Sequence, residues 1–273
     1  MKDKLSHERA FTLLDLLAVL AVIAIVGSLL LPAMARTRIR SGSAGCLSNK
    51  RQVMVAWQAY AADNGDVMCP NAPDEFELNN RGWAEPFSDD ENWSSATGNT
   101  NTTALTRGLL YPYLGNISAY KCPSDYLPSA NGARLRSISM NGAMGAVYEN
   151  LVNPIQNYNP PGLLLVKVSD LTRLTPANAI VFADESMATL KDAWLQVDSQ
   201  GTLFFPDVPA NYHDGAVSVG FADGHAEIHQ WQTVPLLGVP YSPSYVYSSG
   251  FFPGVTKQNV DWIWWSQHVD YNP

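Results

Sequence analysis

The sequence predicts an α+β fold, in which a long N-terminal helix precedes a C-terminal head built on an antiparallel β-sheet. Two observations predict the helix: an uncharged apolar run over residues 16–35 and an apolar stripe of helical period beyond it. A third observation predicts the sheet, because short alternating apolar runs bounded by Gly, Pro, Asn or Asp follow from about residue 110. The net charge of −8 comes without a basic stripe, which argues against a nucleic-acid partner.

The apolar run is long enough to cross a bilayer. About 20 residues at 1.5 Å each give about 30 Å of helix, the thickness of the hydrocarbon core. We therefore expect a single-pass transmembrane segment in the first half of the helix. A plain membrane anchor and a cleaved signal peptide, with Ala33-Met34-Ala35 as its small-residue site, are the alternatives.

The helix is expected to continue beyond the apolar run. Cys46, Val53, Trp57 and Tyr60 follow one helix face, and Asn64-Gly65 is a stop signal because glycine tolerates the left-handed conformation. Residues 12–64 are therefore predicted to form one helix, within a segment assigned to residues 11–64, with Pro32 as a point where a kink is expected. The head is assigned to residues 65–230, and an aromatic-rich extension to residues 231–273.

The clearest strand signal is VSVGFADGHAEIHQW. Val217, Val219 and Phe221 alternate before Asp223-Gly224, and a second apolar alternation follows. An Asp-Gly pair between two such runs predicts a β-hairpin with a type I′ turn, in which both turn residues have positive φ.

The start of the chain resembles the processing signal of prepilins. A short, slightly basic leader, residues 1–10, precedes FTLLDLL. The resemblance implies that a prepilin peptidase cuts between Ala10 and Phe11 and that the new amine of Phe11 is methylated. The fifth residue of the mature chain, usually Glu in this family, is Asp15 here, and Ala10 replaces the usual Gly.

Further motifs resemble those of bacterial type II secretion pseudopilins and type IV pilin-like proteins. They occur in the order Cys46-Leu-Ser-Asn49, Cys122-Pro-Ser-Asp125, Ser137-Ile-Ser-Met-Asn141, and His213 followed after nine residues by Asp223-Gly224, an H-x9-DG motif. The resemblance implies a pilin-like fold and a structural, non-enzymatic filament subunit without a cofactor. It also implies an inner-membrane location, with the head in the periplasm or at the cell surface. The implied partners are the prepilin peptidase, other pilin-like subunits and the inner membrane.

Asp15 gains a role from this resemblance. In a filament of staggered helices, the charged amine of Phe11 on one subunit could lie against the Asp15 carboxylate of another. Apolar faces would then supply the bulk attraction, and the charge pair would set the axial register.

The cysteines and histidines allow other interpretations. None of the three cysteines belongs to a Cys-x-x-Cys pair, so no structural metal site is predicted; in an exported domain two of them could pair, and we expect Cys46 with Cys122. His213, Asp223, His225 and His229 include metal-ligand types, but the favoured interpretation of the H-x9-DG motif is structural, with Asp223-Gly224 in a turn.

Two other functions are compatible with the sequence. The first is a membrane-anchored module that binds a glycan or a protein through exposed aromatic side chains, namely Trp83, Trp93, Trp262, Trp264 and Trp265. The second is a metal-dependent hydrolase centred on His213, Asp223 and His225.

Overall fold

The computed structural model describes residues 13–71, 82–84, 100–126, 128, 132–145, 165–187, 189–190, 193–195, 197, 205–233 and 255–269, without the side chains of residues 29–41. The chain divides into two compact units, Met1–Ser41 and Gly42–Pro273. The predictions for Ala10, Phe11 and Trp93 lie outside the described residues.

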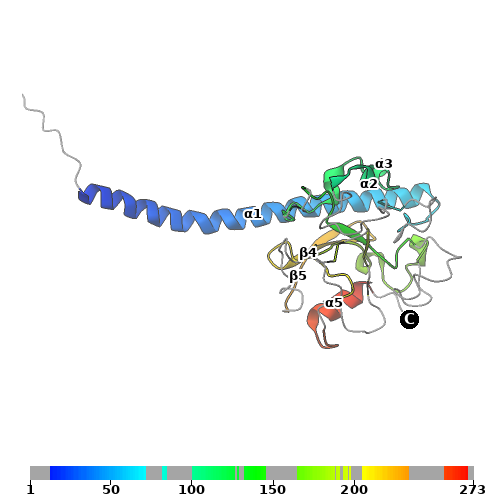
Figure 1. Ribbon diagram of the computed structural model, residues 1–273. Helices are drawn as coiled ribbons and strands as arrows, with labels where there is room; N and C mark the ends of the chain where they lie inside the picture. Colours follow the sequence, from blue (N-terminus) through cyan, green and yellow to red (C-terminus); the bar gives the residue numbers. More distant parts are fainter. Residues whose placement is uncertain are drawn as a thin grey trace, which may run out of the picture. The chain divides into compact units, whose positions relative to one another are not determined.

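The longest element is helix α1 (Leu13–Asp63), which is drawn in blue to cyan in Figure 1. Its ends differ by one residue from the predicted 12–64, and Pro32 lies within it. The helix stops where Gly65 and Asp66 adopt φ values of 64° and 73°, in the left-handed region that glycine tolerates.

The prediction of a transmembrane segment is corrected. Within the described part of the chain, no helix combines the length and the apolar character needed to cross a membrane. Within α1, side chains are described for residues 13–28 and from residue 42 onward, and the first stretch is shorter than the about 20 apolar residues that the hydrocarbon core requires. α1 is therefore a long helix without an assigned membrane span.

A five-stranded sheet forms the centre of the second unit, in the order β3-β1-β2-β4-β5. The strands are β1 (Ile138–Asn141), β2 (Ile180–Asp184), β3 (Trp194–Leu195), β4 (Ala216–Phe221) and β5 (Ala226–Gln230). The predicted antiparallel sheet is wrong in one respect, because β1 and β3 pair in parallel and the sheet is mixed. β2 is antiparallel to β1, and the chain reverses again and passes beyond β1, so β3 runs in the direction of β1.

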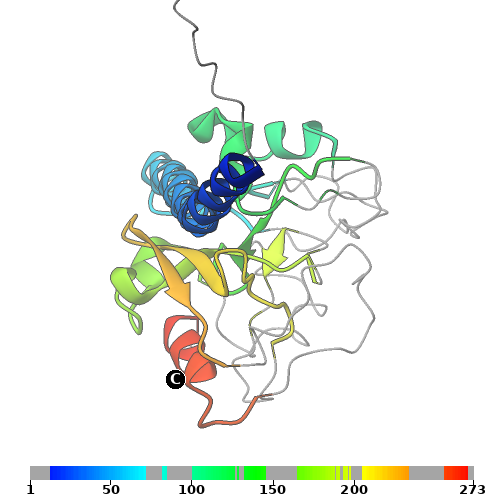
Figure 2. The same ribbon diagram turned by 90° about the vertical axis from the view of Figure 1, so that its left-hand side faces the viewer.

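Short helices complete the unit. They are α2 (Thr103–Thr106), α3 (Tyr111–Leu114), the 3-10 helices η2 (Ile117–Tyr120), η4 (Val168–Asp170) and η5 (Pro176–Asn178), and the C-terminal α5 (Val260–Val269). Figures 1 and 2 show the second half of α1, with α2 and α3, on one side of the sheet and α5 on the other.

The face of the sheet that packs against α1 allows the helix to approach β4 closely. A Cβ atom at Gly220 of β4 would lie 2.8 Å from Met54 Cγ and 3.0 Å from Lys50 Cγ, so only glycine fits there. Around this contact Val53, Met54, Ala56 and Trp57 of α1 form a core cluster with Met140, Val181 and Phe182 of the sheet. The stripe that predicted the helix is therefore its packing face.

The opposite face of the sheet holds a second core cluster. Val217, Val219 and Phe221 of β4 pack there with Phe205, Trp231, Trp262 and Trp265. Trp83, Trp262 and Trp265 are only 0%, 7% and 2% exposed, and Trp264 is half-buried. The expectation that these tryptophans offer an exposed binding surface is wrong. Trp83 is buried in the cluster that contains α1, and Trp262 and Trp265 are buried where the C-terminal helix covers the opposite face of the sheet.

The predicted hairpin is present, with a different turn. β4 and β5 pair antiparallel from Ala216↔Gln230 to Gly220↔Ala226. Gly224 has a φ of 95°, whereas Asp223 is not among the residues with positive φ, so the turn is not type I′. The Gly224 N–H donates to the Phe221 carbonyl at 2.8 Å, and the Phe221 N–H donates to the His225 carbonyl at 2.9 Å. This is a longer loop that ends in a left-handed glycine.

Removal of the Trp265 side chain should destabilise the second unit. Trp265→Ala deletes a buried indole from the cluster between α5 and the sheet, and we expect a loss of about 3–5 kcal/mol in the free energy of unfolding. Chemical denaturation of the purified protein measures this loss. Ile263→Ala on the same helix is the control, because Ile263 is 39% exposed and its change should stay within about 0.5 kcal/mol. Equal losses for the two variants would contradict a packed α5.

Candidate functional site

Residues from the sequence motifs meet at one buried point beside the sheet. Cys46 comes from α1, Cys122 from the loop after η2, Asp184 from the end of β2, and His213 from the turn before β4. One donor atom from each of these four residues lies within 4.8 Å of the others. Their exposed fractions are 1%, 1%, 0% and 4%, so the group, which we call the Cys-Asp-His cluster, is closed to solvent.

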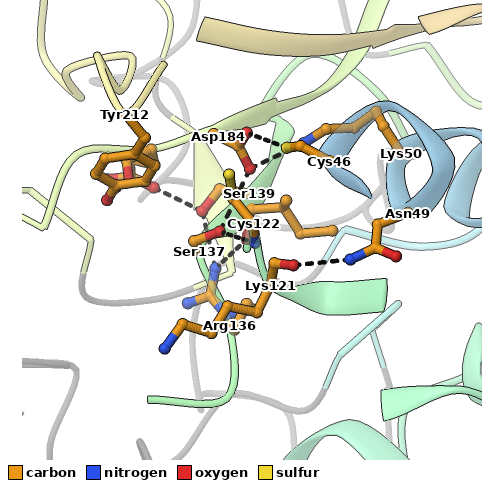
Figure 3. A network of polar contacts seen from close by, with 12 residues as sticks. Cys46, Asn49, Lys50, Lys121, Cys122, Arg136, Ser137, Ser139, Asp184 and Tyr212 are labelled. Atoms are coloured by element: carbon orange, nitrogen blue, oxygen red, sulfur yellow. Dashed lines mark hydrogen bonds and ion pairs between the residues drawn. The ribbon is translucent and has the colours of Figure 1, made fainter. Parts of the chain in front are cut away.

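Asp184 is the acceptor at the centre of this cluster, as Figure 3 shows. Its Oδ1 accepts from Lys50 Nζ at 3.2 Å and from Ser137 Oγ at 3.3 Å, and its Oδ2 accepts from Cys46 Sγ at 3.1 Å. The ammonium and the carboxylate are 1% and 0% exposed. Two opposite charges and two neutral donors therefore satisfy each other away from water, as a buried carboxylate requires.

His213 uses both of its ring nitrogens. Nε2 lies 3.1 Å from Cys122 Sγ, and Nδ1 lies 3.2 Å from the hydroxyl oxygens of both Ser43 and Ser124. The next two residues, Asp214 and Gly215, have φ values of 58° and 84°. The Gly215 N–H donates to the Asn211 carbonyl at 3.2 Å, so a tight turn with two left-handed residues precedes β4.

The cysteines of the cluster are free thiols. Cys46, Cys69 and Cys122 are all unpaired by disulfides, so the predicted Cys46–Cys122 bond is absent from this structure, although the two sulfurs are neighbours. The hydrogen bond with Cys122, followed by burial and the Asp184 charge, raises the pKa of the Cys46 thiol well above its ordinary value. Each sulfur contacts a polar group instead, Asp184 for Cys46 and His213 for Cys122.

The other predicted ligands are not gathered with His213. His225 pairs with Asp223 at the exposed end of the β4–β5 hairpin and stacks on Phe221. His229 stacks on Trp264 with ring centroids 3.4 Å apart. The hydrolase hypothesis around His213, Asp223 and His225 therefore lacks its geometry.

The far end of the H-x9-DG motif also contacts α1. Gln58 Nε2 donates to the Ala222 carbonyl at 3.0 Å, and a Cβ atom at Gly224 would lie 3.0 Å from Gln58 Oε1. His213 reaches Ser43 and the hairpin turn reaches Gln58, so the motif holds both ends of β4 against the helix. These contacts give His213 and Gly224 a structural role.

The first half of α1 is the second feature with functional content. Large apolar side chains between 44% and 77% exposed occupy it, namely Leu13, Leu14, Leu16, Leu17, Val19, Leu20, Val22, Ile23, Ile25 and Val26. Asp15 lies among them in the first turn, and its side chain is exposed. A functional proposal for this protein therefore has two features to explain. They are the donor atoms of the Cys-Asp-His cluster and this exposed apolar surface.

Sequence reasoning missed one member of the cluster, Asp184, and its cation, Lys50. Asp184 follows the apolar run NAIVFA, and Lys50 stands one helical turn after Cys46, on the same face. An acid at the end of a buried strand and a charged residue on a buried helix stripe are the signals that could have indicated this pair. Ser43 carries no comparable signal, and Ser124 lies in the Cys122-Pro-Ser-Asp125 motif without a pattern that pairs it with His213.

No protein-family model, no curated protein and no solved structure matches the chain. The functional assignment therefore depends on the residues of the chain itself.

Replacement of Lys50 should lower the free energy of unfolding, because it leaves the buried carboxylate of Asp184 unpaired. Lys50→Met keeps most of the side-chain volume and leaves Asp184 without its cation. We expect a loss of about 3–5 kcal/mol in the free energy of unfolding, since breaking a buried pair leaves an uncompensated charge. The matched control is Arg51→Met, because Arg51 is exposed and its loss should change stability by no more than about 0.5 kcal/mol. A near-neutral Lys50→Met would contradict the pairing.

Proposed function

We propose that the protein is a structural, non-enzymatic subunit of the pilin-like type, a pseudopilin of a type II secretion or type IV pilus-like system, that polymerises through the first half of α1. The observation that carries this proposal is the exposure of ten large apolar side chains on that segment. Their burial by neighbouring copies of the same segment would form the core of a periplasmic or surface filament.

The magnitudes favour assembly. Full burial of one Leu, Ile or Val side chain is worth about 1.5–3 kcal/mol. Even half of that gain, summed over the segment, is of the order of 10 kcal/mol or more, comparable with the about 4–15 kcal/mol that association costs in lost freedom. Isolated exposed apolar residues are ordinary on protein surfaces, but a continuous run of this size marks an interaction surface.

The spacing of side chains on this segment suits helix–helix packing. Pairs of large residues are separated by a single smaller or polar one at every third position, Asp15, Ala18, Ala21, Ala24 and Gly27. Positions three apart form a row along a helix surface, so the small residues make a groove between ridges of Leu, Ile and Val. Among the described residues, no atom outside the neighbouring helix backbone lies within 4 Å of the place a Cβ atom would take at Gly27. Ridges of a neighbouring helix fit such a groove.

Asp15 gives the packing its register. Its carboxylate lies within the apolar segment, so a packed filament would remove it from water and would require a cation beside it. The resemblance to prepilins supplies that cation as the amine of Phe11 on a neighbouring subunit, formed when the prepilin peptidase removes residues 1–10. The proposed partners are that peptidase and other pilin-like subunits.

The register hypothesis is tested with Asp15→Ala. We expect the variant to fold, because Asp15 lies outside both core clusters, and to lose filament assembly. Co-sedimentation and negative-stain microscopy of filaments from cells carrying the whole assembly system measure this. Asp63→Ala, which removes an exposed acid at the other end of α1, should assemble normally. Unchanged filaments from Asp15→Ala would refute the role of the charge pair.

The processing hypothesis is tested by intact-mass analysis of the protein from its native host. We expect a chain that lacks residues 1–10 and carries a methyl group on the amine of Phe11. A chain that retains Met1 would contradict processing, and it would leave Asp15 without the proposed neighbouring amine.

A further inference from the structure

We propose that Cys46, Cys122, Asp184 and His213 bind one Zn²⁺ ion, and that the ion is a structural centre that joins α1 to the sheet. The proposal does not depend on filament assembly, because all four residues belong to the unit Gly42–Pro273.

The donor set matches zinc chemistry. Two thiol sulfurs, one imidazole nitrogen and one carboxylate oxygen are all ligand types of Zn²⁺, which prefers four donors in a tetrahedron. Bond lengths of about 2.0–2.3 Å place tetrahedral donors about 3.3–3.8 Å apart. Here the four donor atoms lie within 4.8 Å of one another, and two pairs, Cys46 Sγ–Asp184 Oδ2 and Cys122 Sγ–His213 Nε2, are 3.1 Å apart. Small side-chain rotations convert this arrangement to the tetrahedral one.

The charges of the cluster balance with the ion in place. Without zinc, the Lys50 ammonium balances the Asp184 carboxylate and both cysteines are thiols. Binding of Zn²⁺ replaces the two thiol protons, which leave to solvent, so two thiolates, one carboxylate, one ammonium and one Zn²⁺ sum to zero. The buried site thus keeps its neutrality in both states, which is what a low-dielectric interior favours.

The surrounding groups orient the proposed ligands. Ser43 and Ser124 oxygens lie 3.2 Å from His213 Nδ1, and in the tautomer with the proton on Nδ1 they accept it and Nε2 is left for the metal. Lys50 and Ser137 occupy Oδ1 of Asp184, which leaves Oδ2 as a single donor. The Ser124 N–H points at Cys122 Sγ from 3.4 Å, a contact that stabilises a thiolate.

The burial of the ligands indicates a structural rather than a catalytic zinc site. All four ligands are at most 4% exposed, and four protein donors fill a tetrahedral zinc sphere, so no position remains for water or substrate. The ion would therefore hold together four elements that are far apart in the sequence. A disulfide between Cys46 and Cys122 is the competing state of the same two sulfurs.

Metal content is the first test. The full-length protein, purified without chelator or reductant, is analysed for zinc and by intact mass. We expect about one zinc ion per chain, a mass without a disulfide, and less than a tenth of the wild-type zinc content in Cys46→Ser and in Cys122→Ser. Cys69→Ser is the matched control, because Cys69 is a buried free cysteine outside the cluster, and it should retain zinc. A disulfide mass for the wild type, or equal zinc in all four proteins, would overturn the proposal.

Two further measurements remain decisive if the cysteine variants fail to fold. Co²⁺ added to the metal-free wild type should give thiolate-to-metal charge-transfer and tetrahedral ligand-field absorption, and Zn²⁺ should abolish both. The double variant Ser43→Ala/Ser124→Ala should weaken zinc affinity by about 10–100-fold in a chelator competition, whereas Ser48→Ala, at an exposed position, should not. Absence of the cobalt spectrum from the folded wild type, or unchanged affinity in the double variant, would refute the site.

Discussion

The buried ion pair between Lys50 and Asp184 is the constraint on which the docking of α1 depends. Removing an ammonium and a carboxylate from water costs several kcal/mol per ion, and only a close partner with further hydrogen bonds offsets that cost. α1 can therefore lie on the sheet only where Lys50 reaches the end of β2. Gly220 clears the space that the lysine stem and Met54 need for this approach. Apolar packing supplies most of the free energy, and the ion pair selects the position.

The same constraint gives the H-x9-DG motif a physical meaning. His213 stands before β4 and the Asp223-Gly224 turn stands after it, and each contacts a different part of α1 through Ser43 or Gln58. The nine intervening residues comprise β4 and its flanks, so the spacing of the motif sets the distance between the two contacts with the helix. A polar attachment at each end of the strand fixes which face of α1 meets the sheet, which apolar contacts alone specify less strictly.

Local patterns in the sequence predicted much of the architecture. Periodicity and the Asn64-Gly65 stop placed the helix, and alternation placed the β4–β5 hairpin, because both signals act over a few residues. The parallel pairing of β3 had no such signal, since β3 has only two residues and its partner is far away in the chain. The predicted exposure of Trp262 and Trp265 is wrong because aromatic content does not say which surface a C-terminal helix covers.

The candidate site was predicted only in part, for a related reason. The motif residues Cys46, Cys122, Ser137 and His213 were recognised individually, but their convergence depends on long-range contacts that no local pattern encodes. Asp184 is not predicted from the sequence because only its contact partners, which are distant in the chain, distinguish it from any other carboxylate at the end of a strand. The choice of turn shows the same limit: two Asp-Gly pairs follow His213, and the two successive positive φ values fall on the first.

The separation of the cluster residues has a consequence for the order of folding. The contacts of Asp184 with Lys50 and Cys46 span 134 and 138 residues, and the contact of Ser43 with His213 spans 170. Contacts of such high sequence separation form late, because the chain must first lose the entropy of the intervening loops. During synthesis, the packing face of α1 emerges long before the strand that covers it. Until that strand is made, Lys50 and the apolar stripe beside it are exposed to water and can form non-native contacts.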